Sequence, residues 1–255
     1  MRRLTIKRRA QSLYLTIALA GLGLLCVSSP ARAVEENHDP LESMNRGIFW
    51  FNDQVDTYAL VPAATVWDKV LPSRVQRSVA NFFNNLRFPI VAGNDLLQAK
   101  FIHTASDIGR FAVNTTVGIA GFFDPATDWG LEAHDEDFGQ TLGYWGVPAG
   151  PYLVIPIFGP SDARDAGGLA VDGFSTVYPW FIDFVYTVGA RTVDVINTRS
   201  LYLKQVEEAK AASIDYYAAV RNAYVQRRKA QVNDGAGASK EETEDLYTID
   251  KDTVE

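Results

Sequence analysis

The stretch FGQTLGYWGVPAGPYLVIPIFGPS, residues 138–161, contains no charged side chain over 24 consecutive residues. A helix needs roughly 20 apolar residues to cross a bilayer, so the stretch is long enough. Prolines at positions 148, 151, 156 and 160 exclude a continuous helix, because each removes a backbone donor and clashes with the preceding turn. We therefore expect either a buried core segment or a segment lodged partly in a membrane, with its broken backbone covered by protein.

The first 33 residues have the features of an export signal. Five basic residues among the first nine precede an apolar run, and Ala31-Arg32-Ala33 matches a small-x-small cleavage site. We expect cleavage after Ala33. Acylation at Cys26 is the alternative, although Leu25 stands where a small residue normally precedes such a cysteine. The predicted parts of the chain are a signal peptide (1–33), a helical domain (34–232) and a disordered acidic tail (233–255).

The charge of the exported part limits its partners. Without residues 1–33 the chain has 18 basic and 31 acidic side chains, a net charge of −13. This charge argues against binding to nucleic acid and against attachment to anionic lipid heads through a polybasic patch. Any membrane contact must then come mainly from apolar burial. Because Cys26 is the only cysteine, the cleaved chain would contain no disulfide and no thiolate metal site.

Helix signals dominate the exported part. Asp39-Pro40-Leu41-Glu42 predicts a helix start with Asp39 as the N-cap, and further prolines begin the next segments. Residues 152–158 look extended, and Ser161 with Asp162 can cap another helix. The predicted fold class is therefore all-α, with little or no strand and with helices over about 39–58, 62–70, 72–86, 89–98, 100–119, 135–145, 179–204 and 205–232.

The predicted helix over 100–119 has two distinct faces. Its apolar and polar residues separate at helical spacing, which is typical of an amphipathic helix. We interpret His103 and Asp107, one turn apart, as a hydrogen-bonded pair on the polar face. The apolar face holds Phe101, Ala105, Ile108 and Ala112, and the polar face holds His103, Asp107, Arg110 and Asn114.

The sequence contains no recognisable catalytic motif. It has no HExxH pair, no GxSxG elbow and no phosphate-binding glycine loop. The run from His134 to Asp137 suggests a metal or acid/base site, but contiguous residues on a helix point in different directions, and acidic residues at a helix start usually interact with its dipole. We therefore expect no catalytic residue, no metal site and no cofactor.

Glycines and aromatic residues indicate where helices pack closely, where the chain turns and which side chains could face a membrane. We expect Gly139 and Gly143 to allow close helix packing, and Gly146 and Gly150 to serve a turn. Aromatic residues occur in adjacent groups, which on helices cover more than one side. They form either an aromatic-rich core with some exposed rings or a belt at a lipid interface. The predicted membrane-facing residues are Phe122, Phe123, Trp145, Tyr178, Trp180 and Phe181.

Several of these motifs, in this order, resemble the MlaA (VacJ) family of outer-membrane phospholipid transport proteins. The likeness covers about residues 39–229 and includes Arg110-Phe111 with Asn114-Thr115, the block 137–168 and Gln226-Arg227-Arg228. Tyr216 stands where relatives often have proline, so we expect the last helix to begin earlier or run straighter. The motif residues are Asp39, Pro40, Glu42, Asn45, Arg46, Phe138, Gly139, Gly143, Gly146, Pro151, Arg164 and Asp165.

The resemblance implies a ring of helices in the periplasmic leaflet of an outer membrane. Misplaced outer-leaflet phospholipids would pass through its amphipathic channel to a soluble periplasmic carrier, and an outer-membrane porin would be a further partner. Such a protein needs no covalent chemistry. The residues we expect on the polar channel wall are Arg110, Asn114, Asp183, Arg191, Asp194 and Asn197.

Two other functions remain open at this point. One is a periplasmic hydrolase that uses paired carboxylates, which buried acidic pairs with raised pKa values around a closed pocket would favour. The other is a structural adaptor for a porin, which would have no through-going channel. The candidate carboxylates for the hydrolase are Asp135, Asp137, Asp162 and Asp165.

Overall fold

The computed structural model describes residues 39–176 and 183–234. The all-α prediction is confirmed: one short antiparallel hairpin, β1 (Tyr152–Ile155) with β2 (Gly159–Asp162), is the strand content of these residues. The helices are α2 (Glu42–Val55), η1 (Asp56–Leu60), α3 (Val61–Val70), α4 (Ser73–Leu86), α5 (Phe88–Leu97), α6 (Phe101–Thr116), α7 (Pro125–Asp128), α8 (Phe138–Tyr144), α9 (Ala163–Ser175), α10 (Phe184–Leu201), α11 (Leu203–Ala212) and α12 (Tyr216–Val232).

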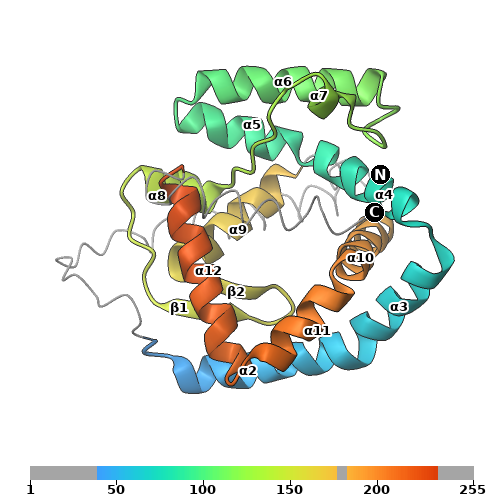
Figure 1. Cartoon of the computed structure of the whole chain (residues 1–255). Helices are drawn as coiled ribbons and strands as arrows, with labels where there is room; N and C mark the ends of the chain where they lie inside the picture. Colours follow the sequence, from blue (N-terminus) through green and yellow to red (C-terminus); the bar gives the residue numbers. More distant parts are fainter. Residues whose placement is uncertain (1–38, 177–182, 235–255) are drawn as a thin grey trace, which may run out of the picture.

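The helices are arranged as a ring (Figure 1). In this view α2 and α3 form the lower and right side, α4 to α6 the top, and α8, α9, α12 and the hairpin the left. Helices α10 and α11 return along α3, and α12 packs against α8. Among the described residues, no helix combines the length and the apolar character needed to span a membrane.

The first arm of the ring is one continuous helical rod. We expected a break before Pro62, but α2 passes through the π-helical turn η1 directly into α3 with helical dihedrals at both junctions. Pro62 lies in the first turn of α3, directly after the π turn. Arg199 of α10 donates to both carboxylate oxygens of Asp56, at 2.7 and 3.1 Å, and so anchors the π turn.

Two asparagines of α2 hold the hairpin. The side chain of Asn45 donates to Tyr152 O and accepts from Val154 N, both at 2.9 Å. Two helical turns later, Asn52 donates to Ile155 O at 3.0 Å. These amides pair with one edge of β1 as a neighbouring strand would.

The other motif residues of this region tie α2 to α12. The assigned helix α2 begins at Glu42, with Leu41 rather than Asp39 as the N-cap residue. The Asp39 carboxylate still accepts from Leu41 N at 3.2 Å, as predicted for a capping residue, and also from Asn45 and from the hydroxyl of Tyr217. Arg46 bonds Glu42 at 2.7 Å and Asp215 at 2.5 Å. Pro40 is exposed just before the helix.

Helices α8 and α9 approach closely because both present glycine. A Cβ on Gly168 would lie 2.4 Å from the backbone nitrogen of Gly139, and one on Gly143 would lie 2.8 Å from an Arg164 nitrogen. Gly146 and Gly150 have φ values of +87° and +75°, which suit the turn expected of them.

Buried ionic groups surround this glycine contact. Asp162 caps α9 by accepting from Asp165 N at 2.7 Å, as we predicted, and the buried Arg164 donates to Asp165 at 3.0 Å. Phe138 opens α8, where its backbone N–H donates to Asp172. The exposed Pro151 precedes β1.

Several helix boundaries differ from the sequence predictions, two of them for a clear reason. Helix α8 begins at Phe138 rather than near Asp135, because Asp137 is its N-cap and accepts from Gln140 N at 2.8 Å. The single helix predicted over 205–232 is wrong: α11 ends at Ala212, and α12 begins at Tyr216 with Asp215 as its cap. The last helix therefore neither begins earlier nor runs straight through Tyr216.

The described part of the chain has a polar interior and an apolar exterior. Its buried residues comprise 19 polar or charged and 10 hydrophobic ones, while 29 large hydrophobic side chains are exposed. In a water-soluble domain the interior is mainly hydrophobic. The interior polar groups are instead bonded to one another, as with Asn197, which joins Trp67 of α3 to Gln76 of α4 at 3.0 Å each.

Helix α6 shows this arrangement most clearly. Its predicted apolar face is exposed, with Phe101 67% and Ile108 53% accessible. Its predicted polar face is turned inward, with Asp107 and Asn114 buried. The two faces were correctly separated from the sequence, and the polar one faces the protein.

Candidate functional site

A cavity of about 530 Å³ opens between α4, α5, α6 and the segment 124–135. This volume lies within the range of about 300–1,000 Å³ typical of sites for small molecules. Three consecutive helices and the segment that follows them build it, and α4 and α6 both contact α5. The lining residues are Asn81, Asn84, Asn85, Arg87, Phe88, Val91, Asp107, Arg110, Phe111, Asn114, Asp124, Thr127, Ala133, His134 and Asp135.

One wall of the cavity is made of amides. Asn81, Asn84 and Asn85 recur at i, i+3 and i+4 on α4, so they share one face of the helix. Asn85 donates to Thr115 at 3.0 Å, which connects this face to α6. The sequence analysis missed these residues, although the spacing in NFFNNL (81–86) was a usable signal.

An aromatic pair supplies the apolar part of the cavity lining. Phe88 of α5 and Phe111 of α6 stack with ring centroids 4.3 Å apart and an interplanar angle of 12°. Val91 adds aliphatic surface beside them. The cavity therefore presents apolar side chains and polar side chains to the same space.

Arg110 and Asn114, two predicted wall residues, do line this cavity and also hold its outer segment. Arg110 donates to Asp124 at 2.7 Å and to Thr127 at 3.1 Å, and Asn114 donates to Asp124 at 2.8 Å. Burial raises the pKa of Asp124, but hydrogen bonds from Thr127, Asn114 and Arg110 outweigh it, so this pKa lies below its usual value. Asp124 is thus held ionised under the cavity.

Arg87 connects the two groups of predicted wall residues. It lies where α4 ends and α5 begins, and it lines both the large cavity and a second, small one that includes Arg191 and Asp194 of α10. Among the described residues it forms an ion pair with the half-exposed Asp135, at 2.9 Å. Burial raises the pKa of Asp194. Sequence reasoning missed Arg87.

The other two predicted wall residues lie elsewhere. Asn197 is fully buried in the tie between α3, α4 and α10, so it is a structural residue rather than a wall residue. Asp183 is exposed at the start of α10 and lines neither of these two cavities.

The predicted pair of His103 with Asp107 is wrong. Asp107 accepts instead from His134 Nδ1, at 3.2 Å to each oxygen, and His103 Nδ1 lies 3.7 Å from Asp95. The residue spacing was right, but the segment before α8 inserts His134 against α6. The close stack of the two imidazoles, with centroids 4.0 Å apart, follows from this insertion.

Each of the four residues from His134 to Asp137 contacts different partners, as expected for contiguous positions. His134 meets Asp107, while Asp135 meets Arg87 at 2.9 Å. Glu136 is buried and bonded by Gln98 and Lys100 at 2.8 and 2.9 Å. Asp137 accepts from Arg228 and caps the start of α8.

The carboxylates named for a hydrolase do not form a common site. Asp162 and Asp165 are buried together, and burial raises the pKa of Asp162 to about 6. Arg164, Tyr224 and Arg228 surround this pair, and it lines neither described cavity. Asp137 is held by Arg228, and Asp135 lies on the rim of the large cavity.

The predicted membrane-facing aromatics are exposed where they are described. Phe122, Phe123 and Trp145 are 38%, 56% and 52% accessible. Phe122 stacks on Phe82 at 4.8 Å, and the indole of Trp145 donates to Leu97 O at 3.1 Å, so both rings are held while exposed. The remaining three, Tyr178, Trp180 and Phe181, lie outside the described residues.

Known proteins match this chain over most of its length. The family model described as MlaA lipoprotein covers residues 37–231. The intermembrane phospholipid transport system lipoprotein MlaA of Escherichia coli K12 is 34% identical, over 86% of this chain and 88% of that protein. The protein of the same name from Haemophilus influenzae is 32% identical, over 88% and 90%. An uncharacterized protein of Rickettsia felis is 36% identical, over 77% and 79%.

A solved structure agrees with the fold. It is described as the structural basis for maintenance of bacterial outer membrane lipid asymmetry, and it matches with a TM-score of 0.68 and 34% identity over 77% of this chain and all of the other. The resemblance drawn from the motifs is thereby confirmed. Because one family model spans well over half of the sequence, the chain belongs to the MlaA lipoprotein family.

Proposed function

We propose that this protein is a phospholipid transport component that maintains the lipid asymmetry of an outer membrane. It would pass misplaced outer-leaflet phospholipids through an amphipathic passage toward the periplasm. Family membership supports this function, since the relatives from two bacteria are named as intermembrane phospholipid transport lipoproteins. No bond needs to be made or broken in such a task, so we propose no catalytic residue and no cofactor.

The observation that carries the proposal is the two-sided cavity within an apolar-surfaced ring. A phospholipid has a charged head and apolar tails, and the cavity offers amides and guanidinium groups beside a stacked phenylalanine pair. Moving a two-tailed lipid through water exposes dozens of methylenes at about 0.8 kcal/mol each. A passage that shields the tails and solvates the head lowers this barrier.

Arg87 is the residue we assign to the phosphate. A guanidinium binds phosphate through paired hydrogen bonds, and this one sits between the two cavities with an exposed partner that a ligand can displace. Arg110 is less available because Asp124 and Thr127 already occupy it. The proposed polar wall comprises Arg87, Arg110, Asn114, Arg191 and Asp194, with Asp183 toward its edge.

The exposed apolar faces support a position in the membrane. The outward face of α6 and the exposed aromatic residues suit contact with lipid tails, and the proposed location is the periplasmic leaflet of the outer membrane. Export through the signal at 1–33 is part of this proposal, with anchoring at Cys26 as the open alternative. From the resemblance, we also propose an outer-membrane porin and a soluble periplasmic lipid carrier as partners.

Phospholipid cross-linking tests the proposed passage. A photoreactive side chain at Asn84, an exposed residue of the cavity wall, should capture phospholipid in intact cells. The matched position is Gln205, exposed on α11, where much less lipid should be captured. Equal capture at both positions, or none at Asn84, would remove the cavity from the lipid path.

A further inference from the structure

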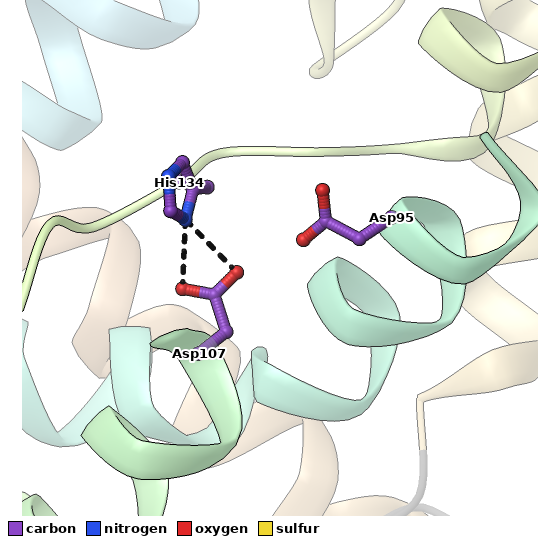
Figure 2. A group of neighbouring side chains, drawn as sticks. All are labelled: Asp95, Asp107 and His134. Atoms are coloured by element: carbon purple, nitrogen blue, oxygen red, sulfur yellow. Dashed lines mark hydrogen bonds and ion pairs between the residues drawn. The ribbon is translucent and has the colours of Figure 1, made fainter. Parts of the chain in front are cut away.

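A buried carboxylate beside the large cavity has no hydrogen-bonding partner among the described residues. Asp95 of α5 is 0% exposed, and neither of its carboxylate oxygens accepts a hydrogen bond from them. Leaving a buried charged group unsatisfied is costly. Figure 2 shows its carboxylate directed toward Asp107 and His134, and one ligand atom of each of the three residues lies within 4.8 Å of the others.

A second imidazole lies beside this group. His103 Nδ1 is buried, has no hydrogen bond to the described residues and lies 3.7 Å from Asp95 Oδ1. Its ring stacks on that of His134 at 4.0 Å with an interplanar angle of 11°, so it packs against the group. Two carboxylates and one imidazole from α5, α6 and the segment before α8 therefore converge on one place.

The nearby cations are committed to other acids. Lys100 pairs with Glu136 at 2.9 Å and with Asp234, and Arg110 pairs with Asp124 at 2.7 Å. Neither cation therefore forms an ion pair with Asp95 or Asp107.

We propose that Asp95, Asp107 and His134 bind a divalent transition-metal ion. Carboxylate oxygens combined with imidazole nitrogens and no thiolate suit an ion such as Zn²⁺ or Mn²⁺. Two carboxylates balance its charge. The large cavity, which Asp107 and His134 line, gives the ion a path to the site.

The bound ion would stabilise the side of the cavity that Asp107 and His134 line. It would link α5, α6 and the segment leading into α8, in addition to the contact between His134 and Asp107. The site lies apart from the amide wall, so the metal would stabilise the cavity without taking part in lipid binding.

The experiment compares the full-length protein with Asp95→Asn after removal of metal by a chelator. Calorimetric titration with Zn²⁺ should give one ion bound per wild-type molecule. Asp95→Asn should weaken binding by more than about 100-fold, since even residues that only orient a ligand cost up to this factor. Glu132→Gln, an exposed change two residues before His134, should leave binding intact.

Thermal unfolding gives a second, independent readout of metal binding. In chelator, Asp95→Asn should melt at a higher temperature than the wild type, because the amide removes repulsion without changing the side-chain shape. Added Zn²⁺ should raise the melting temperature of the wild type and leave the variant unchanged. If Zn²⁺ affects neither protein, or both equally, the proposal is overturned and the two carboxylates share a proton instead.

Discussion

Arg228 of α12 donates two parallel hydrogen bonds to Asp137, at 2.7 and 2.6 Å, across 91 residues of sequence. The same carboxylate caps α8 by accepting from Gln140 N at 2.8 Å. One side chain therefore both starts α8 and joins it to the C-terminal helix. This contact connects the last described helix to the left side of the ring (Figure 1).

We predict that Asp137→Asn destabilises the fold at pH 7 by about 1.5–3 kcal/mol, the range for hydrogen bonds to charged groups. Burial raises the pKa of Asp137, but Arg228 outweighs it and holds this pKa below the usual 3.8. The stabilisation is therefore present above about pH 4 and is lost as the pH falls through the lowered value. Urea unfolding at pH 7 and pH 3 measures both effects.

The exposed Asp128→Asn is the control for this variant. It should leave the free energy of unfolding within the ±0.5 kcal/mol usual for surface changes. The assigned ion pair would be contradicted if the free energies of unfolding of Asp137→Asn and the wild type differed by as much at pH 3 as at pH 7.

The close packing of α8 on α9 predicts a large effect of one methyl group. Gly168→Ala should destabilise the protein by about 1–3 kcal/mol, as overpacking does, because the new Cβ would lie 2.4 Å from Gly139 N. Gly167→Ala, the next residue, meets nothing within 4 Å and should stabilise the helix by up to about 1 kcal/mol. Opposite signs in chemical denaturation are expected, and equal effects would refute the contact.

Charge reversal at Arg87 should impair lipid binding without unfolding the protein. Its ion pair with Asp135 is about half exposed, and such pairs contribute about 0–1 kcal/mol. We expect Arg87→Glu to abolish most phospholipid capture at Asn84 while changing stability by less than about 1 kcal/mol. Arg227→Glu on α12 reverses a charge at a side chain 69% exposed and should preserve capture. Equal capture by both variants would exclude Arg87 from the phosphate site.

The exposed face of α6 should govern membrane association. Ile108→Asp places a charge on a side chain that is 53% exposed and that we assign to the lipid side. Flotation of the protein with vesicles should decrease for this variant and not for Gln205→Asp on α11. Unchanged flotation of Ile108→Asp would place this face in contact with water or protein.

Much of the local structure could be predicted because it depends on neighbouring residues. Asp162 caps α9 as expected, and the glycines of α8 serve close packing. The break between α11 and α12 was missed even though Asp215 is an N-cap residue type, because the helical pattern on both sides is continuous.

The direction of the amphipathic faces could not be predicted from periodicity. The sequence of α6 separates Ile108 from Asp107, but a helical pattern does not say whether the surroundings are water or lipid. Likewise, Asp95 lies in an apolar stretch, and its neighbours Asp107 and His134 are brought to it only by the packing of three segments. Arg87 was hidden for the same reason, since only the fold places it between two cavities.

Outer-leaflet phospholipid in living cells measures the transport function itself. Deletion of the gene should raise the amount of phospholipid exposed on the cell surface, and the wild-type protein should restore it. Asn84→Trp, which fills the cavity from an exposed position, should fail to restore it although the protein is present at normal levels, while Gln205→Trp should succeed. Full restoration by Asn84→Trp, or a deletion strain with unchanged surface phospholipid, would contradict transport through this cavity.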